Sequence, residues 1–315
     1  MTAGAAGAAG AAARADRAAA AAGAGAGTSG GKPTFPGRRK VDSPPLGALE
    51  DLEARAGSSA ALLRTMVGSI LRPLGGWMSS AGAVELLSAL DIPGSTARSA
   101  LTRLCARGVL VREGRGGAAG YALTAAAVPM LERGDRRIFA DRTPPADDSW
   151  CLLSYSIPER DRARRHRLRR RLESLGCGTV SDGLWIAPAR LADDLRVSAD
   201  ELAASGESTL FTAVRPETAD LPALLATWYD LDRMRAAHRD FQAHFAALST
   251  PADDRAAFAR WMRALDEWRV IPYLDPVFPA TALPADWPGP ASAAVFADLR
   301  ASLAPRALAF AAPRL

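Results

Sequence analysis

Residues 95–124 read STARSALTRLCARGVLVREGRGGAAGYALT, and this stretch decides the fold of the N-terminal part of the chain. A helix is predicted from Ser95, a favoured capping residue, to about Ala106, and Gly108 suits its C-terminal stop. Apolar residues recur within it at helical spacing and predict one buried stripe. They are Ala97, Ala100, Leu101 and Leu104. Two short strands, VLVRE and GYALT, are predicted around a flexible glycine-rich segment, GRGGAAG.

Polar and positively charged residues cover the other side of this helix. Arginine, serine and threonine donate the hydrogen bonds that base edges and phosphates accept, so this face is suited to a DNA groove. The hairpin tip is short and basic, as a wing over the DNA backbone or minor groove needs to be. The predicted DNA-binding residues are Ser95, Thr96, Arg98, Ser99, Thr102, Arg103, Arg107, Arg112 and Arg115.

Two more helices are predicted upstream. SSAALLRTMVGSIL has apolar residues at helical spacing, with Ser58 or Ser59 as its cap. SSAGAVELLSALDI, at 79–92, is the second helix. Its inward-facing residues are predicted to be Val84, Leu87 and Leu90. A tight turn at Pro93 and Gly94 separates it from the third helix.

Three helices followed by a β-hairpin predict a winged helix-turn-helix. Residues 58–124 hold seven arginines and three acids, which makes this unit basic. The alternative is a helical cap with a solvated face. Pattern and charge together favour DNA binding.

The middle of the chain alternates between strand and helix patterns. WCLLSYSI predicts a strand, residues 159–175 a helix, GTVSDGLWIAP a second strand region, and STLFTAV at 208–214 a later strand. This order indicates a ferredoxin-like α+β domain. The helix carries eight arginines against three acids. Either it is a solvated or dimer-forming face with i,i+4 partners, or it contacts an anionic ligand or the DNA backbone.

The ends of the chain differ in character. Residues 1–57 are rich in Ala, Gly and Pro and predict a disordered tail, either inert or a nonspecific phosphate contact. The region 218–268 is predicted to be strongly helical. The segment VIPYLDPVFPATALPADWPGP is predicted to be extended because it is rich in proline, and a final helix is predicted at 291–303. The fold class is therefore α+β. The predicted parts are the tail 1–57, a winged helix at 58–142, a ferredoxin-like domain at 150–217 and a mainly helical domain at 218–315.

Composition limits the partners and the cellular compartment that we expect for the protein. The 315 residues carry a formal net charge of +5, and almost all the positive charge is arginine, since Lys32 and Lys40 are the only lysines. The arginine guanidinium forms paired hydrogen bonds with phosphate groups and guanine edges. A GC-rich genome would also raise the arginine content of the protein. Three cysteines, Cys105, Cys151 and Cys177, are too widely spaced to predict a disulfide framework or a zinc site. No apolar run is long enough to span a membrane, so a cytoplasmic protein is expected.

No catalytic constellation is evident in the sequence. His238, Asp240 and His244 suggest a metal set, but six residues on one helix turn through about 240°, so the two histidines point to different faces. There is no G-x-S-x-G elbow and no Walker A pattern. We expect no metal, no cofactor and no enzymatic activity. Two alternatives stay open: a metal-dependent nuclease that uses Asp161 or Asp182, and a nonspecific DNA-binding architectural protein.

Three stretches, in this order and spacing, resemble the PaaX family of transcriptional repressors. They are STARSALTRLCARGVLVRE with GYALT, then YSIPERDRARRHRLRRRLESLGCGTVSDGLWIAP, then WRVIPYLDPVFPATALPADWPG. The resemblance runs from about residue 58 to residue 303. It implies a homodimer on operator DNA that is released by an effector, of which phenylacetyl-CoA is the best known in the family. It places the recognition helix at Ser95–Ala106 and the wing at Val109–Thr124.

The chain departs from the family pattern at the wing, whose tip is poorer in Arg and Tyr. The effector therefore stays open, and no effector-binding residue is predicted. The middle region also resembles the small ferredoxin-like endonucleases of CRISPR systems, which carry a metal-binding aspartate just after the first strand. Ser156 stands at the matching place, and its hydroxyl lacks the charge that a Mg²⁺ site favours. The resemblance thus implies the scaffold without the nuclease.

Overall fold

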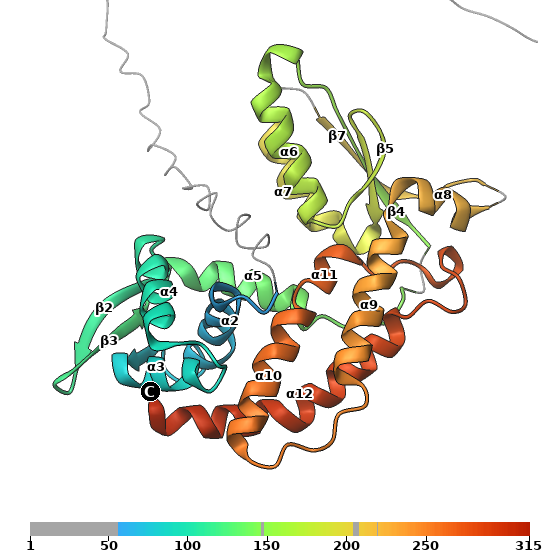
Figure 1. The fold of residues 1–315 in the computed structure, drawn as a ribbon. Coiled ribbons are helices and arrows are strands. Elements are labelled where there is room, and N and C mark those ends of the chain that lie inside the picture. The colour runs from blue at the N-terminus through green and yellow to red at the C-terminus, as the bar shows by residue number, and fades with distance from the viewer. Residues whose placement is uncertain (1–55, 146–147, 204–207, 219) are drawn as a thin grey trace, which may run out of the picture. The chain divides into compact units, whose positions relative to one another are not determined.

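The structure is a computed structural model. It describes residues 56–145, 148–203, 208–218 and 220–315. All of them belong to one compact unit, Ser43–Leu315, and the fold is α+β, with helices and two antiparallel sheets (Figure 1). The predicted tail lies outside the described residues apart from its last two positions. There the backbone N–H of Gly57 donates to Asp266 Oδ2 at 2.7 Å.

The first described region consists of helices followed by a hairpin. Its helices are α2 (Ser59–Met66), the π-helical η1 (Val67–Leu71), α3 (Ser80–Ser88) and α4 (Gly94–Ala106). Its strands are β1 (Trp77–Ser79), β2 (Leu110–Arg115) and β3 (Ala118–Leu123), in the order β1-β3-β2. The predicted cap of the first helix is confirmed, because Ser58 Oγ accepts from the N–H of Ala61 at 3.3 Å. The strand β1 was not predicted, since three residues carry too little pattern.

The second helix is shorter than predicted, and its predicted inward face is confirmed at two of three positions. It begins after Ser79, whose Oγ accepts from the N–H of Gly82 at 3.0 Å, and it ends at Ser88. Leu87 and Leu90 are buried as predicted, whereas Val84 is only half-buried, and Leu86 is buried in addition. Each residue turns a helix by about 100°, so Leu86 lies about 160° around the helix from Val84, and burial of Leu86 leaves Val84 at the edge of the buried face.

The prediction that Ser95 caps α4 is wrong. The N–H of Ala97 bonds to the carbonyl of Pro93 at 2.9 Å, so the helix begins at Gly94 and Ser95 lies within its first turn. The predicted stop at Gly108 is confirmed: its φ is +70°, and the N–H groups of Gly108 and Val109 bond to the carbonyls of Cys105 and Leu104, each at 3.0 Å. This pair of bonds is a Schellman motif.

The glycine-rich segment of the hairpin is more ordered than predicted. Arg115 pairs with Ala118, so the strands enclose only Gly116 and Gly117. These two glycines have φ values of +57° and +81°. Two successive positive φ values define the tight I′-type hairpin turn, which glycine adopts without a steric penalty.

The strand β3 also depends on a glycine. A Cβ on Gly120 would lie 2.4 Å from the carbonyl oxygen of Met78 and 2.6 Å from the Trp77 ring. Replacing Gly120 by alanine is therefore expected to lower the free energy of unfolding by about 1–3 kcal/mol, as overpacked sites do. Urea denaturation measures the loss. Gly114→Ala is the control, because its Cβ would meet only Ala118 O at 3.5 Å; equal stability of the two variants would contradict the prediction.

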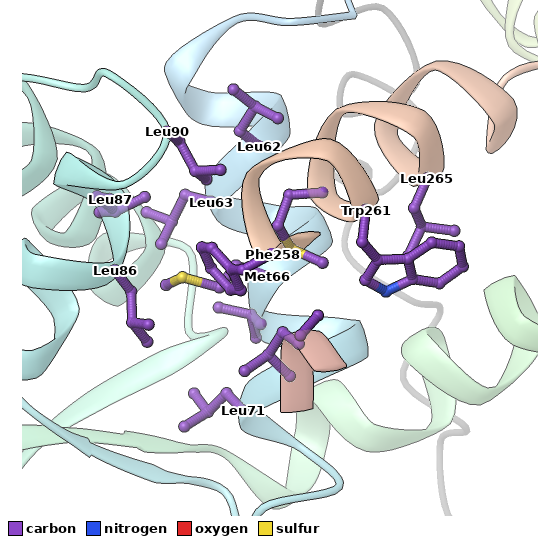
Figure 2. Packing of buried hydrophobic residues seen from close by; sticks show 14 of the residues in the cluster. Leu62, Leu63, Met66, Leu71, Leu86, Leu87, Leu90, Phe258, Trp261 and Leu265 are labelled. Atoms are coloured by element: carbon purple, nitrogen blue, oxygen red, sulfur yellow. The ribbon is translucent and has the colours of Figure 1, made fainter. Parts of the chain in front are cut away.

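The core of this region is continuous with that of the C-terminal helices. Figure 2 shows α2 and η1 side chains packed on one side against α3 and on the other against α10 (Asp254–Trp268). The labelled residues are Leu62, Leu63, Met66, Leu71, Leu86, Leu87, Leu90, Phe258, Trp261 and Leu265. Burial of this shared surface holds the helix α4 and the hairpin on the C-terminal half of the protein.

The middle region contains the four-stranded sheet, in the order β5-β6-β4-β7. Its strands are β4 (Trp150–Tyr155), β5 (Gly178–Ser181), β6 (Leu184–Pro188) and β7 (Ser208–Val214). Its helical elements are η3 (Glu159–Asp161), α6 (Arg162–Ser174), η4 (Ala189–Leu191) and α7 (Ala192–Ala203). The predicted second strand region forms two strands, because Gly183, with φ of +77°, turns the chain between them.

The remaining elements are helical. They are η2 (Ala125–Ala127), α5 (Val128–Ile138), α8 (Leu221–Trp228), α9 (Leu231–Phe245), α11 (Ile271–Leu274), η5 (Ala280–Ala282), α12 (Gly289–Ala311) and η6 (Ala312–Arg314). The predicted final helix, 291–303, is too short, since α12 continues past Pro305. The segment 270–290 holds the short helix α11 and is largely buried, so it is not simply extended. Within the described ranges, no helix combines the length and the apolar character that a bilayer requires.

Candidate nucleic-acid interface

The helix α4 presents two chemically different faces. The predicted apolar stripe is confirmed, because Ala97, Ala100, Leu101 and Leu104 are all buried. Arg98, Ser99, Thr102 and Arg103 are exposed on the opposite side, together with Ser95 in the first turn, while Thr96 is half-buried. Because apolar residues fix one face against α2 and α3, the polar face points into solvent.

The charges of this region are arranged unevenly. Each of its three acids pairs with an arginine: Glu85 with Arg314 at 2.7 Å, Asp91 with Arg263 at 2.5 Å and Glu113 with Arg115 at 2.6 Å. No carboxylate among the described residues pairs with Arg98, Arg103 or Arg112, and all three are exposed. These arginines therefore form a positive surface that protein acids do not neutralise.

The hydroxyls on α4 are already engaged as donors. Ser99 Oγ donates to the carbonyl of Ser95 at 3.0 Å, and Thr102 Oγ1 donates to that of Arg98 at 2.9 Å. Their lone pairs stay available as acceptors, and rotation of the hydroxyl would redirect the proton toward an outside partner. The arginines supply donors without any such rearrangement.

The hairpin tip is fixed by Trp77, which sequence reasoning missed. Its Nε1 donates to the carbonyl of Glu113 at 3.0 Å, and the Arg115 guanidinium lies 5.7 Å from the centroid of its ring. The predicted contact Arg115 is thus held by an aromatic ring and by Glu113. Arg112 is exposed on β2, and Arg107 is exposed at the C-cap of α4. A lone tryptophan at the start of a three-residue strand gives no sequence signal for this contact.

The arginine-rich helix α6 is partly neutralised by local acids. Arg169 pairs with Glu173 at 3.0 Å with i,i+4 spacing, and Arg165 pairs with Glu159 at 2.7 Å. A hydrogen bond from Arg165 lowers the pKa of Glu159. Leu168 and Leu172 anchor the helix to the sheet. Exposed ion pairs of this kind are typical of a solvated face.

The two histidines weighed as metal ligands do not come together. His238 is buried with its Nε2 2.9 Å from Asp275 Oδ2, whereas His244 is exposed beside Glu267. In the described parts of the chain, no group of three or more His, Cys, Asp or Glu side chains is placed to hold a metal ion. Burial raises the pKa of the Cys177 thiol to about 12 and also raises the pKa values of Cys105 and Cys151. These cysteines are protonated at neutral pH and are not activated nucleophiles.

Three family models match the chain, and together they span most of the described residues. They are "PaaX-like protein" at 58–127, "PaaX protein central Cas2-like domain" at 143–225 and "PaaX-like protein C-terminal domain" at 229–313. The chain belongs to the PaaX family. These domains indicate a PaaX-type transcriptional regulator.

A solved structure is similar to this PaaX-family chain over most of its length. It is an uncharacterized protein, Rv0674, from Mycobacterium tuberculosis, with 26% sequence identity and a TM-score of 0.54. The similarity covers 78% of this chain and 97% of that one. No curated protein matches the chain.

Proposed function

We propose that this protein is a dimeric, sequence-specific repressor that an aromatic acyl-CoA releases from operator DNA. The observation that carries the DNA-binding role is the exposed face of α4, where Arg98 and Arg103 have no carboxylate partner among the described residues. Arginine at such a position reads guanine by a bidentate hydrogen bond. The predicted contacts on the hairpin, Arg112 and Arg115, would meet the backbone beside the groove.

The topology supports the two finer fold assignments. The helices α2, α3 and α4 followed by a hairpin, with β1 closing the sheet, have the connectivity of a winged helix-turn-helix. The order β4-α6-β5-β6-α7-β7, with sheet order β5-β6-β4-β7, has the connectivity of a ferredoxin-like domain. The first would read the DNA, and the second would serve as a scaffold between it and the C-terminal helices.

The proposed mechanism uses two copies of α4. In a homodimer they would enter successive major grooves of an inverted repeat, with half-sites about one helical turn apart. The effector, phenylacetyl-CoA or a related aromatic acyl-CoA, would bind better to a dimer geometry that cannot span both half-sites. A ligand shifts this equilibrium only by the difference in its affinity for the two forms.

Fluorescence anisotropy on the DNA upstream of the protein's own gene tests the proposal. We expect tight binding that survives excess competitor DNA and that phenylacetyl-CoA abolishes. DNA binding that does not change on addition of phenylacetyl-CoA would support the repressor but contradict this effector. Weak binding that falls steeply between two salt concentrations, with no preference over bulk DNA, would contradict sequence-specific recognition at this site.

A further inference from the structure

A cavity of about 860 Å³ lies among three segments that are far apart in the sequence: residues 138–144 after α5, the end of α10, and one face of α12. Its walls include three aromatic rings. Trp268 and Phe296 stack with centroids 4.4 Å apart and planes 10° apart, and Phe139 lies 6.1 Å from Phe296. Small-molecule sites commonly measure about 300–1,000 Å³ and have mainly apolar walls. This cavity has that size and that lining, and it is open to solvent along α12, where Ala297 and Ala301 are exposed.

The α12 wall is made mostly of small side chains. Ala293, Ala297, Ala301 and Ala304 line the cavity from successive turns of the helix. A side chain larger than a methyl group at any of them would project into the space. These alanines explain why α12 leaves room beside the aromatic stack instead of packing against residues 138–144.

Two arginines line the cavity, and their charges are compensated to different extents. Arg142 has a side chain only 8% exposed and lies 5.5 Å from the Trp268 ring centroid. Its Nη2 donates to the carbonyl of Asp275 at 3.0 Å and lies 3.5 Å from Asp275 Oδ2, so that carboxylate already compensates its charge. Arg300 is exposed, lies 4.5 Å from the Phe139 ring centroid, and pairs with no carboxylate among the described residues. The one acid in the lining, Asp141, is occupied by the N–H and hydroxyl of Thr143 at 2.9 and 2.7 Å.

We propose that this cavity is the effector site, and that it takes an organic anion with an aromatic body. The aromatic walls would hold the apolar body, and Arg300 with Arg142 would face its negative charge. The regulatory role of the site rests on the proposed function. The prediction that the cavity binds an aromatic anion rests only on its lining residues. A free aromatic acid and its CoA thioester both combine an aromatic ring with negative charge.

Both walls of the cavity are attached to the DNA-binding region. Residues 138–144 continue directly from α5, and Trp268 Nε1 donates to the carbonyl of Ile138 at 3.0 Å. The helix α12 leads into η6, where Arg314 pairs with Glu85 on α3. An anion that draws Arg142 away from Asp275 would loosen residues 138–144 from the C-terminal helices. Ligand binding would thus change how α4 is held.

The site is tested first without DNA, by titrating the full chain with anilinonaphthalene sulfonate, a fluorescent aromatic anion. We expect Ala301→Trp, which fills the cavity, to weaken binding of this probe by at least about tenfold. Ala294→Trp is the matched control, because Ala294 is exposed on α12 and lies outside the cavity lining. Failure of the wild type to bind the probe, or equal binding by both variants, would overturn the proposal.

The charge is tested by Arg300→Ala, with Arg239→Ala, an exposed arginine on α9, as its control. We expect about two- to fivefold weaker binding of the probe in the first variant and no change in the second, since the charge at residue 300 is largely solvated. Equal affinity of the two variants for the probe would show that Arg300 does not contribute to the site. Circular dichroism confirms that all variants are folded.

The link to regulation is tested on the upstream DNA, with phenylacetyl-CoA and phenylacetate as separate ligands. We expect Ala301→Trp to bind DNA as the wild type does and to resist release. Release of this variant at the wild-type ligand concentration would show that the effector binds elsewhere. If the wild type does not bind the DNA, the proposed function fails, and if neither ligand releases it, the proposed effector class fails. In both cases the probe titration still tests whether the cavity binds an aromatic anion.

Discussion

Replacing Asp275 by alanine is expected to lower the free energy of unfolding by about 3–5 kcal/mol, the cost of removing one partner from a buried charged network. The Asp275 carboxylate is 4% exposed and lies 2.9 Å from His238 Nε2, 3.2 Å from Trp287 Nε1 and 3.5 Å from Arg142 Nη2. Alanine would leave these buried polar groups without their acceptor.

The same carboxylate also holds a strained backbone. Val277 has φ of +63°, a value that a β-branched residue rarely adopts, and its N–H donates to Asp275 Oδ1 at 2.7 Å. A strained residue persists only where its surroundings fix it. Loss of this hydrogen bond would let the segment 275–278 relax, and that segment carries the buried Phe278.

Guanidinium denaturation of the wild type and the variant measures the effect. Asp286→Ala is the control, since Asp286 pairs with Arg235 at 2.8 Å and has a side chain 68% exposed. An exposed pair is worth about 0–1 kcal/mol, so this control should stay close to the wild type. Equal losses in the two variants would mean that the Asp275 network does not stabilise the fold.

The contribution of Asp275 should also depend on pH. Burial raises its pKa, but the hydrogen bond with His238 and the charge of Arg142 outweigh burial, so the pKa is lowered overall. A lowered pKa in the folded state stabilises the protein above the unfolded value of about 4, and this stability is lost as the pH falls through the folded pKa. The difference between the wild type and Asp275→Ala should therefore shrink in acid, and a difference that grows there would contradict this sign.

Local patterns predicted the helices best. The apolar residues of α2 and η1, at 62, 63, 66, 67, 70 and 71, are all buried, because helical spacing places them on one face regardless of what covers it. The buried and exposed faces of α4 were predicted for the same reason. The start of α4 was not, because the preference of serine for a cap gave way to the carbonyl of Pro93, which accepts the first helical bond.

Features built from distant segments left no local signal. The cavity takes walls from residues 138–144, from Trp268 and from α12, and Asp275 gathers partners from α9 and from the segment after α5. Neither grouping follows a spacing that the sequence displays. The DNA contacts stay a prediction, which a local pattern could make because most of these residues lie on one helix or one hairpin. The pairing of Arg115 with Glu113 and Trp77 became visible only in the fold.

Replacing Arg98 or Arg103 by alanine is expected to weaken operator binding by about 1–3 kcal/mol, or roughly 5- to 150-fold, if that arginine contacts a base. Both side chains are exposed on α4, opposite its buried stripe, and the acids of this region pair with other arginines. Because no carboxylate among the described residues pairs with either guanidinium, its removal should cost little stability. The weaker binding should therefore come from the DNA interface itself.

Anisotropy on the operator and on sites with single base changes separates the two ways in which an arginine can bind DNA. If Arg103 hydrogen-bonds a base, Arg103→Ala relaxes specificity at one position of the operator. If Arg103 binds a phosphate, the variant binds every sequence more weakly by the same factor and shows a smaller salt dependence. Arg233→Ala, an exposed arginine on α9, is the control and should bind as the wild type does. If both Arg98→Ala and Arg103→Ala bind like this control, α4 is not the helix that reads the DNA, and its exposed arginine face would then have to serve another partner.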